Sequence, residues 1–242
     1  MEASDWFSES CLKDGDDCLN VMGKYFRGLA FYKGLCGPVN YKEAAKWFTK
    51  AAEHEEDCYW NLDSNRDLRS CKYSAWYYLG VMYYYGQGVD VDYDKALRWL
   101  RMAVDESNEG YAVIGDAYRE GHGVEQNYGA AEECYSKAPV AYAKKRLGDM
   151  YRDGIGVKQN YREALKHYQQ AAEWGSADAQ DCLADMYRNG QSVAKDPAEA
   201  MKWYMKAAQN GSAAAKQKIM EMMGGFTQTG ISPDSAQKEI TD

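Results

Sequence analysis

Three pairs of an aspartate followed three residues later by an arginine are the side chains best suited to polar chemistry. The pairs are Asp116 and Arg119, Asp149 and Arg152, and Asp185 and Arg188. Residues three apart are neighbours on a helix, so each pair predicts an ion pair on a solvated face that contributes about 0.2–0.5 kcal/mol. The alternative is a ligand site, because an arginine guanidinium binds carboxylates through two parallel hydrogen bonds. The spacing leaves both interpretations open.

Tyrosines form the second concentration of functional side chains, in the N-terminal part of the chain. The candidates are Tyr25, Tyr32, Tyr77, Tyr78, Tyr84 and Tyr85. One interpretation is packing between helices, and the other is contact with a partner, because tyrosine and arginine are enriched at binding hot spots. The run from Tyr83 to Tyr85 turns through more than half of a helix circumference, so these three rings cannot all be interior. At least one of them is predicted to face solvent or a partner.

No constellation in the sequence specifies a reaction, so we expect no catalytic residues, no metal site and no cofactor. The histidines His54, His122 and His167 stand at spacings that no metal motif uses. The Gly-x-Gly-Val segments follow predicted helices and lack the Lys-Ser/Thr of a phosphate loop. The acidic run that starts at Asp90 has Lys95 where a calcium loop requires glycine. The chain is therefore predicted not to be an enzyme.

The elements that carry these residues repeat five times. Each copy is anchored by a small residue in a Leu-Gly-x-x-Tyr pattern, at Gly28, Gly80, Gly115, Gly148 and Ala184. A glycine stands six residues after every anchor. An asparagine or aspartate stands twelve residues after every anchor, at Asn40, Asp92, Asn127, Asn160 and Asp196. Repetition at a nearly fixed period is the signature of a stacked array.

Each copy predicts a pair of helices. The first helix runs through the anchor, with apolar residues at helical spacing, and ends at the glycine, which favours a left-handed backbone. The second helix begins after the Asn or Asp, whose side-chain oxygen accepts hydrogen bonds from free backbone N–H groups. A glutamate three residues after the cap, as at Glu43, Glu163 and Glu199, completes a capping box. Tyr and Trp side chains are expected to fill the space between the two helices.

The segment 147–175, which begins Leu-Gly-Asp-Met-Tyr-Arg-Asp-Gly-Ile-Gly-Val, resembles the Sel-1-like repeat (SLR), a relative of the tetratricopeptide repeat. The resemblance extends over about residues 14–223. The first copy departs from it, because Phe31 replaces the tyrosine and Cys36-Gly37-Pro38 stands in the Gly-x-Gly-Val loop. The resemblance implies an all-α, right-handed superhelical α-solenoid of about five helix pairs with a C-terminal capping helix.

The repeats also set the expected boundaries. We expect one SLR solenoid over residues 1–223, with repeats at about 14–53, 72–107, 108–140, 141–175 and 176–211. An insertion at 54–71 separates the first two copies. A capping helix at 212–223 is expected to cover the open end of the array. A disordered tail is expected over 224–242.

The same resemblance implies a concave groove lined by the first helices. By similarity to tetratricopeptide arrays, the six tyrosines would form its aromatic N-terminal part and the three Asp–Arg pairs its polar C-terminal part. We therefore expect a non-enzymatic adaptor that binds a protein or peptide partner, with a bacterial toxin-immunity or secretion-accessory role. The alternative is a small-molecule (β-lactam-like) binder or weak hydrolase, as in cysteine-rich SLR relatives. Those relatives pair cysteines within every repeat, whereas the cysteines here share no common offset.

Composition restricts the partner and the compartment. The 242 residues include 37 acidic and 29 basic side chains, for a net charge of −8, which disfavours a nucleic-acid partner. No stretch approaches the roughly 20 apolar residues of a membrane-spanning helix. The first residues lack the pattern of a signal peptide, so we expect a cytoplasmic protein, with a periplasmic or secreted location as the alternative. The seven cysteines are expected to be mostly free thiols, and the protein a monomer or weak homodimer.

Overall fold

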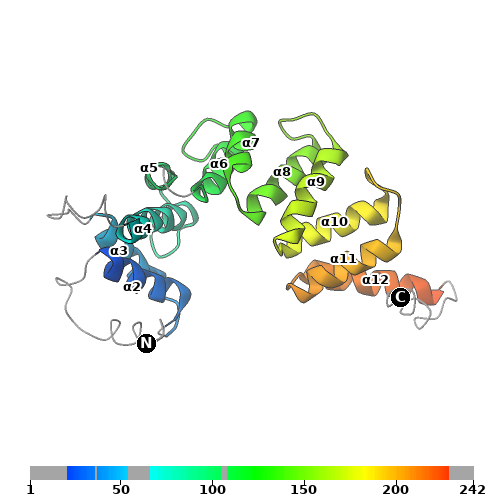
Figure 1. The fold of residues 1–242 in the computed structure, drawn as a ribbon, viewed down its shortest axis with the longest axis horizontal. Helices are drawn as coiled ribbons and strands as arrows, with labels where there is room; N and C mark the ends of the chain where they lie inside the picture. The colour runs from blue at the N-terminus through cyan, green and yellow to red at the C-terminus, as the bar shows by residue number, and fades with distance from the viewer. Residues whose placement is uncertain (1–20, 36, 54–65, 105–107, 229–242) are drawn as a thin grey trace. The chain divides into compact units, whose positions relative to one another are not determined.

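The computed structural model describes residues 21–35, 37–53, 66–104 and 108–228, and within these ranges it contains helices and no strand, as expected. The chain divides into two compact units, residues 1–127 and 128–242. The first unit holds α2 (Val21–Lys33), α3 (Tyr41–Ala52), α4 (Arg66–Tyr85), α5 (Tyr93–Ala103) and α6 (Gly110–Glu120). The second holds α7 (Tyr128–Lys137), α8 (Ala141–Asp153), α9 (Tyr161–Glu173), α10 (Ala177–Asn189), α11 (Pro197–Gln209) and α12 (Ala213–Gln228) (Figure 1).

In the first, second, fourth and fifth repeats the two helices pack on each other, and neighbouring pairs stack within each unit. The most extensive packing joins α2 to α3, α4 to α5, α8 to α9 and α10 to α11. Successive pairs are stacked through α3 on α4 and through α9 on α10, and α12 packs on α11. Each unit is thus a stack of helix pairs, which is the packing of an α-solenoid.

The predicted capping residues begin the second helices. The side chains of Asn40, Asp92, Asn160 and Asp196 each accept a hydrogen bond from a backbone N–H in the first turn, at 2.9–3.3 Å. In all five copies the backbone N–H of the cap position also donates to the carbonyl oxygen of the residue three after the anchor. Those bonds measure 2.8–3.1 Å and close the loop between the two helices. The first helices α6, α8 and α10 end at left-handed glycines, as expected.

Small anchor residues set the distance between the two helices of a pair. A Cβ atom added to Gly148 would lie 2.5 Å from the ring of Tyr168, and one added to Gly80 would lie 2.5 Å from Leu100. Tyr168 and Leu100 stand at the same position of their repeats and are completely buried. The anchor is therefore small because the largest core side chain of the second helix lies directly against it.

Two helices differ in length from the expected elements. Helix α4 begins at Arg66, so residues 66–71 belong to it and not to an insertion. Helix α12 continues to Gln228, past the expected end at 223, because Gly224 keeps a right-handed backbone and does not end the helix. The rest of the expected insertion, 54–65, and of the expected tail, 229–242, lies outside the described residues. No helix in the described part of the chain is both long and apolar enough to span a membrane.

Candidate functional site

Four of the six candidate tyrosines pack in the first unit, on the neighbouring helices α2 and α4. The Tyr78 ring stacks on Phe48, with 5.0 Å between centroids and 5° between planes. Tyr32 lies edge-on to Tyr78 at 5.0 Å, and Tyr25 lies 6.3 Å from it. Burial raises the pKa of both Tyr77 and Tyr78 to about 12. The rings of Tyr25, Tyr32 and Tyr78 therefore fill space between the first two repeats, as the packing interpretation predicts, and Tyr77 lies edge-on to Tyr78 at 5.4 Å.

Tyr84 and Tyr85, at the end of α4, have opposite surroundings. Tyr84 is 7 % exposed, and its hydroxyl oxygen lies 3.2 Å from Nδ1 of His122, whose ring stacks on Tyr93. Burial raises the pKa of Tyr84 above its ordinary value. Tyr85 is 50 % exposed, and its hydroxyl donates to Oδ2 of Asp116 at 3.4 Å. The prediction that one ring of this run faces solvent is correct, and that ring belongs to Tyr85.

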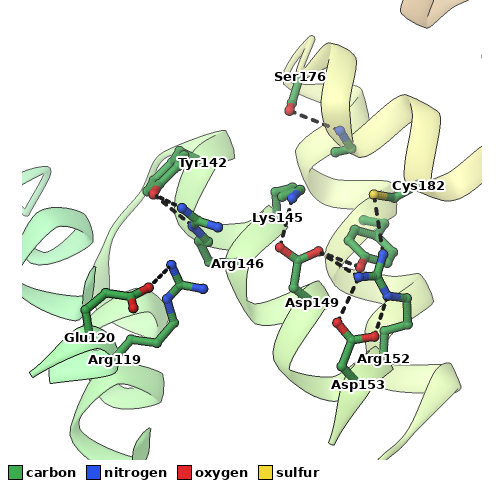
Figure 2. Close-up of polar contacts among 12 residues, drawn as sticks. Arg119, Glu120, Tyr142, Lys145, Arg146, Asp149, Arg152, Asp153, Ser176 and Cys182 are labelled. Carbon is green, nitrogen blue, oxygen red and sulfur yellow. Dashed lines mark hydrogen bonds and ion pairs between the residues drawn. The ribbon is translucent and has the colours of Figure 1, made fainter. Parts of the chain in front are cut away.

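The first Asp–Arg pair does not form the expected ion pair in the described structure. Asp116 is only 4 % exposed and accepts the Tyr85 hydrogen bond described above. Arg119 instead directs Nη2 to Oε1 of its neighbour Glu120, at 2.5 Å (Figure 2). Arg119 is itself only 23 % exposed, and the carboxylate that it reaches, Glu120, is 44 % exposed, whereas Asp116 is buried.

The second pair is connected mainly to other residues. Asp149 accepts the Tyr168 hydroxyl on Oδ1 and the Lys145 ammonium on Oδ2, both at 2.8 Å, and Arg152 approaches it only to 3.8 Å. Arg152 binds Asp153 through Nε and Nη2, both at 2.8 Å (Figure 2). These bonds lower the pKa of Asp153 below its ordinary value. A ligand carboxylate would have to displace Asp153 to bind Arg152 in the same way.

The third pair lies where α12 meets α10. Asp185 accepts the Tyr204 hydroxyl on Oδ1, and Oδ2 accepts the ammonium of Lys218 at 2.7 Å. Lys218 also donates to Asp181 at 2.7 Å. Burial lowers the pKa of Lys218, but its hydrogen bonds to both carboxylates outweigh this effect and leave the pKa raised. Arg188 lies 3.4 Å from Asp185 and is 36 % exposed, so it keeps the greatest access to a ligand among the three arginines.

Comparison with known families decides which repeat this is. The Sel1 repeat model matches residues 21–55, 74–108, 109–138, 141–176 and 177–212. The chain belongs to the Sel1 repeat family. A comparison with curated proteins gave no match. The family assignment confirms the resemblance and the α-solenoid class.

Solved structures show the same Sel1 architecture. A Sel1 repeat protein from Oxalobacter formigenes is 28 % identical with a TM-score of 0.72, over 97 % of this chain and 89 % of that one. A protective antigen of uropathogenic Escherichia coli with an SLR fold is 30 % identical with a TM-score of 0.67, over 90 % of this chain. This chain spans only 44 % of that antigen's length. An immunity protein from Pseudomonas aeruginosa, 19 % identical with a TM-score of 0.51, covers 81 % of this chain and 67 % of its own and shares the fold.

The tyrosine partners of the aspartates are the residues that sequence reasoning missed. In the third to fifth Sel1 repeats an aspartate follows the anchor and a tyrosine stands twenty residues after the anchor. The first two repeats have an apolar residue at both positions, Leu29 with Phe48 and Val81 with Leu100. This joint change from apolar to polar is the signal that an aspartate and a tyrosine contact each other. The structure shows the contact in the fourth and fifth repeats.

Proposed function

We propose that this Sel1 chain is a non-enzymatic adaptor that binds a protein or peptide on the face formed by its first helices. Tyr85 is the observation that carries the proposal. Half of its side chain is exposed, and its hydroxyl is held by Asp116 of the next repeat. A tyrosine held in place before binding loses little conformational freedom when a partner covers it, which is typical of a hot spot.

The other candidate residues take supporting places in this proposal. Tyr84 lies beneath Tyr85, with 4.9 Å between the ring centroids, and fixes its orientation from a buried position. Arg188 is the arginine proposed to meet a carboxylate of the partner in the second unit, because its contact with Asp185 is long and its side chain is accessible. Arg152 would meet a ligand only at the expense of its two bonds to Asp153.

Toxin immunity or a secretion-accessory function is the cellular role proposed for this adaptor. The immunity protein from Pseudomonas aeruginosa supports the first role to the extent that it shares the fold. Cys134 and Cys182 are free thiols, which agrees with a reducing compartment such as the cytoplasm. The β-lactam-binding alternative gains no support from them, because it derives from relatives with paired cysteines in every repeat.

The test uses the purified full chain as bait, with mass spectrometry to identify retained proteins and calorimetry to measure their affinity. Tyr85→Ala should weaken binding of the genuine partner by about 2 kcal/mol, or roughly thirtyfold. Tyr41→Ala is the matched control, because Tyr41 is 37 % exposed but lies at the start of a second helix. Equal losses in both variants, or none in Tyr85→Ala, would show that the first-helix face is not the binding face.

A further inference from the structure

The first unit contains a pocket lined mainly by its second helices. Its volume is about 210 Å³, and it lies between α3 and α5, with one residue from α4. The lining residues are Thr49, Glu53, Tyr83, Lys95, Arg98, Trp99 and Met102. This volume accommodates a single large side chain, so the pocket is suited to one anchoring residue of a larger ligand and not to a whole helix.

The pocket combines apolar walls with a cation at its edge. Trp99 and Tyr83 are partly buried, and Met102 is 41 % exposed. The Lys95 ammonium forms an ion pair with Asp92 at 3.0 Å and lies 5.5 Å from the centre of the Tyr83 ring. Arg98 is exposed, and within the described part of the chain no ion pair engages it. It is therefore the cation that an incoming carboxylate would meet.

Comparison with the other repeats shows that this charge pattern is specific to the second repeat. At the positions of Lys95 and Arg98, three other repeats carry a glutamate and a lysine. These are Glu43 with Lys46, Glu163 with Lys166 and Glu199 with Lys202, which form ion pairs at 3.6, 3.6 and 3.2 Å. Two basic residues cannot neutralise each other in this way. Lys95 pairs with Asp92 instead, and Glu53 is the carboxylate among the lining residues, so Arg98 is the lining cation that no ion pair engages in the described part of the chain.

Among the described residues, the ring of Trp99 in the pocket wall also has no lysine over it, in contrast to the equivalent ring in the fifth repeat. In the fifth repeat the residue equivalent to Trp99 is Trp203, and Lys206 places its ammonium 4.1 Å from that ring. The residue equivalent to Lys206 in the second repeat is Met102, which carries no charge and lies at the pocket wall. A neutral, flexible methionine adapts to an apolar guest, as methionines do at protein-binding surfaces.

We propose that this pocket binds an acidic peptide segment of a partner protein, with one large apolar side chain beside Trp99 and a carboxylate on Arg98. The apolar side chain supplies the burial, and the guanidinium supplies orientation and selectivity for acidic sequences. The net negative charge of the chain repels acidic peptides elsewhere, so binding of such a peptide requires a local basic site. This second site is formed mainly by the second helices α3 and α5, and the α4 residue that lines it is Tyr83 and not Tyr85.

The probe is a fluorescein-labelled synthetic peptide in which a phenylalanine stands between runs of glutamates, and anisotropy measures its binding to the full chain. We expect saturable binding that weakens as salt rises. Arg98→Glu should weaken it by about tenfold or more, because it replaces attraction by repulsion. The matched control is Arg101→Glu, since Arg101 is exposed on the same helix outside the pocket, and it should change the affinity less than about twofold. A peptide with alanine in place of phenylalanine should bind at least about tenfold more weakly.

Three results would overturn the proposal. The first is the absence of saturable binding by the phenylalanine peptide. The second is an equal loss in Arg98→Glu and Arg101→Glu, which would indicate general charge attraction. The third is a dimer in sedimentation that Arg98→Glu dissociates, which would make a second copy of the chain the occupant. Circular dichroism of each variant confirms that the helices remain folded, since both arginines are exposed.

Discussion

The Asp149 carboxylate shows how a single residue position changes character between Sel1 repeats. It is largely buried, at 13 % side-chain exposure, and its donors are Tyr168 and Lys145 at 2.8 Å. A buried carboxylate needs such donors because desolvation without compensation is costly. The aspartates of the last two repeats therefore have a structural role, because each accepts the hydroxyl of a buried tyrosine from the second helix of its pair.

Tyr168→Phe should lower the free energy of unfolding by about 1.5 kcal/mol, because Asp149 loses one donor while the volume of the ring is kept. Chemical denaturation measures this value. The first repeat provides the matched control, since it has Leu29 and Phe48 at the same two positions. The double variant Tyr168→Phe/Asp149→Leu should recover most of the loss. If the double variant is less stable than Tyr168→Phe alone, an apolar pair cannot replace the aspartate–tyrosine pair at these two positions.

The pH dependence of stability should contain a contribution from His167. This ring stacks on Tyr151 at 5.6 Å, and burial lowers its pKa below the ordinary value near 6.5. The unfolded chain then binds a proton more readily than the folded chain, so stability falls as pH drops below about 6.5. His167→Phe should reduce this acid-side slope, by at most about 1.4 kcal/mol per pH unit. Denaturant titrations between pH 5 and 8 in both proteins give the comparison; an unchanged slope contradicts the assignment.

Residue roles were harder to predict from sequence than residue positions. The sequence located Tyr85 and Arg188 among the candidates, but it did not separate them from Tyr84 and Arg152. The separation depends on contacts between elements, since His122 covers Tyr84 and Asp153 occupies Arg152. Spacing along one helix contains no information about such contacts.

Helix caps and loop glycines were predictable at the scale of the element because they are local. The capping oxygens of Asn160 and Asp196 bond to N–H groups within three residues, so the signal lies in a short stretch of sequence. The ends of α4 and α12 were not predictable in the same way. The helical propensity on either side of position 66 and of Gly224 gives no sharp boundary.

Gly156→Ala should test how the loops hold successive repeats together. Gly156 has φ +74°, and an added Cβ would lie 2.0 Å from the Cβ of Tyr128 at the start of α7. Backbone strain and the clash together should cost about 3 kcal/mol. Gly175→Ala is the control with strain alone, because φ is +83° and no atom lies within 4 Å of the added Cβ. It should cost about 1 kcal/mol by chemical denaturation; equal costs would mean that the loop contact contributes nothing.

Ser192 occupies the loop position that is glycine in the second to fourth repeats, and it is the only non-glycine residue with positive φ, at 66°, in the described part of the chain. Its side chain is exposed, so no packing compensates for the strain. Ser192→Gly should relieve this strain, but it also makes the unfolded chain more flexible. The net effect should be an increase of about 0.5–1 kcal/mol in the free energy of unfolding. Ser192→Ala, which keeps the strain, should leave thermal and chemical stability nearly unchanged. A loss of stability in the glycine variant would contradict this account.

At the scale of the whole molecule, the sequence predicts the periodicity of the repeat array well. It does not predict the boundary between the two compact units. The two compact units meet between Asn127 and Tyr128, inside the third repeat. Nothing in the repeat pattern marks this point, because the third copy keeps the anchor Gly115, the glycine Gly121 and the capping position Asn127. A repeat motif encodes how one helix pair is built, and the division depends on how pairs are grouped along the chain.

Local destabilisation should therefore remain within one unit, because helices in such arrays pack chiefly on their neighbours in sequence. Native-state hydrogen exchange provides the measurement, with peptides from α2–α5 and from α8–α11 followed separately. Gly156→Ala should speed exchange in α8–α11 by about a hundredfold where exchange follows opening of that unit, and leave α2–α5 nearly unchanged. Gly88→Ala provides the reciprocal case, because an added Cβ there would lie 2.4 Å from the Tyr41 carbonyl carbon. It should speed exchange in α2–α5 alone. If each variant speeds exchange equally in both units, the molecule opens as one cooperative body and the division has no energetic meaning.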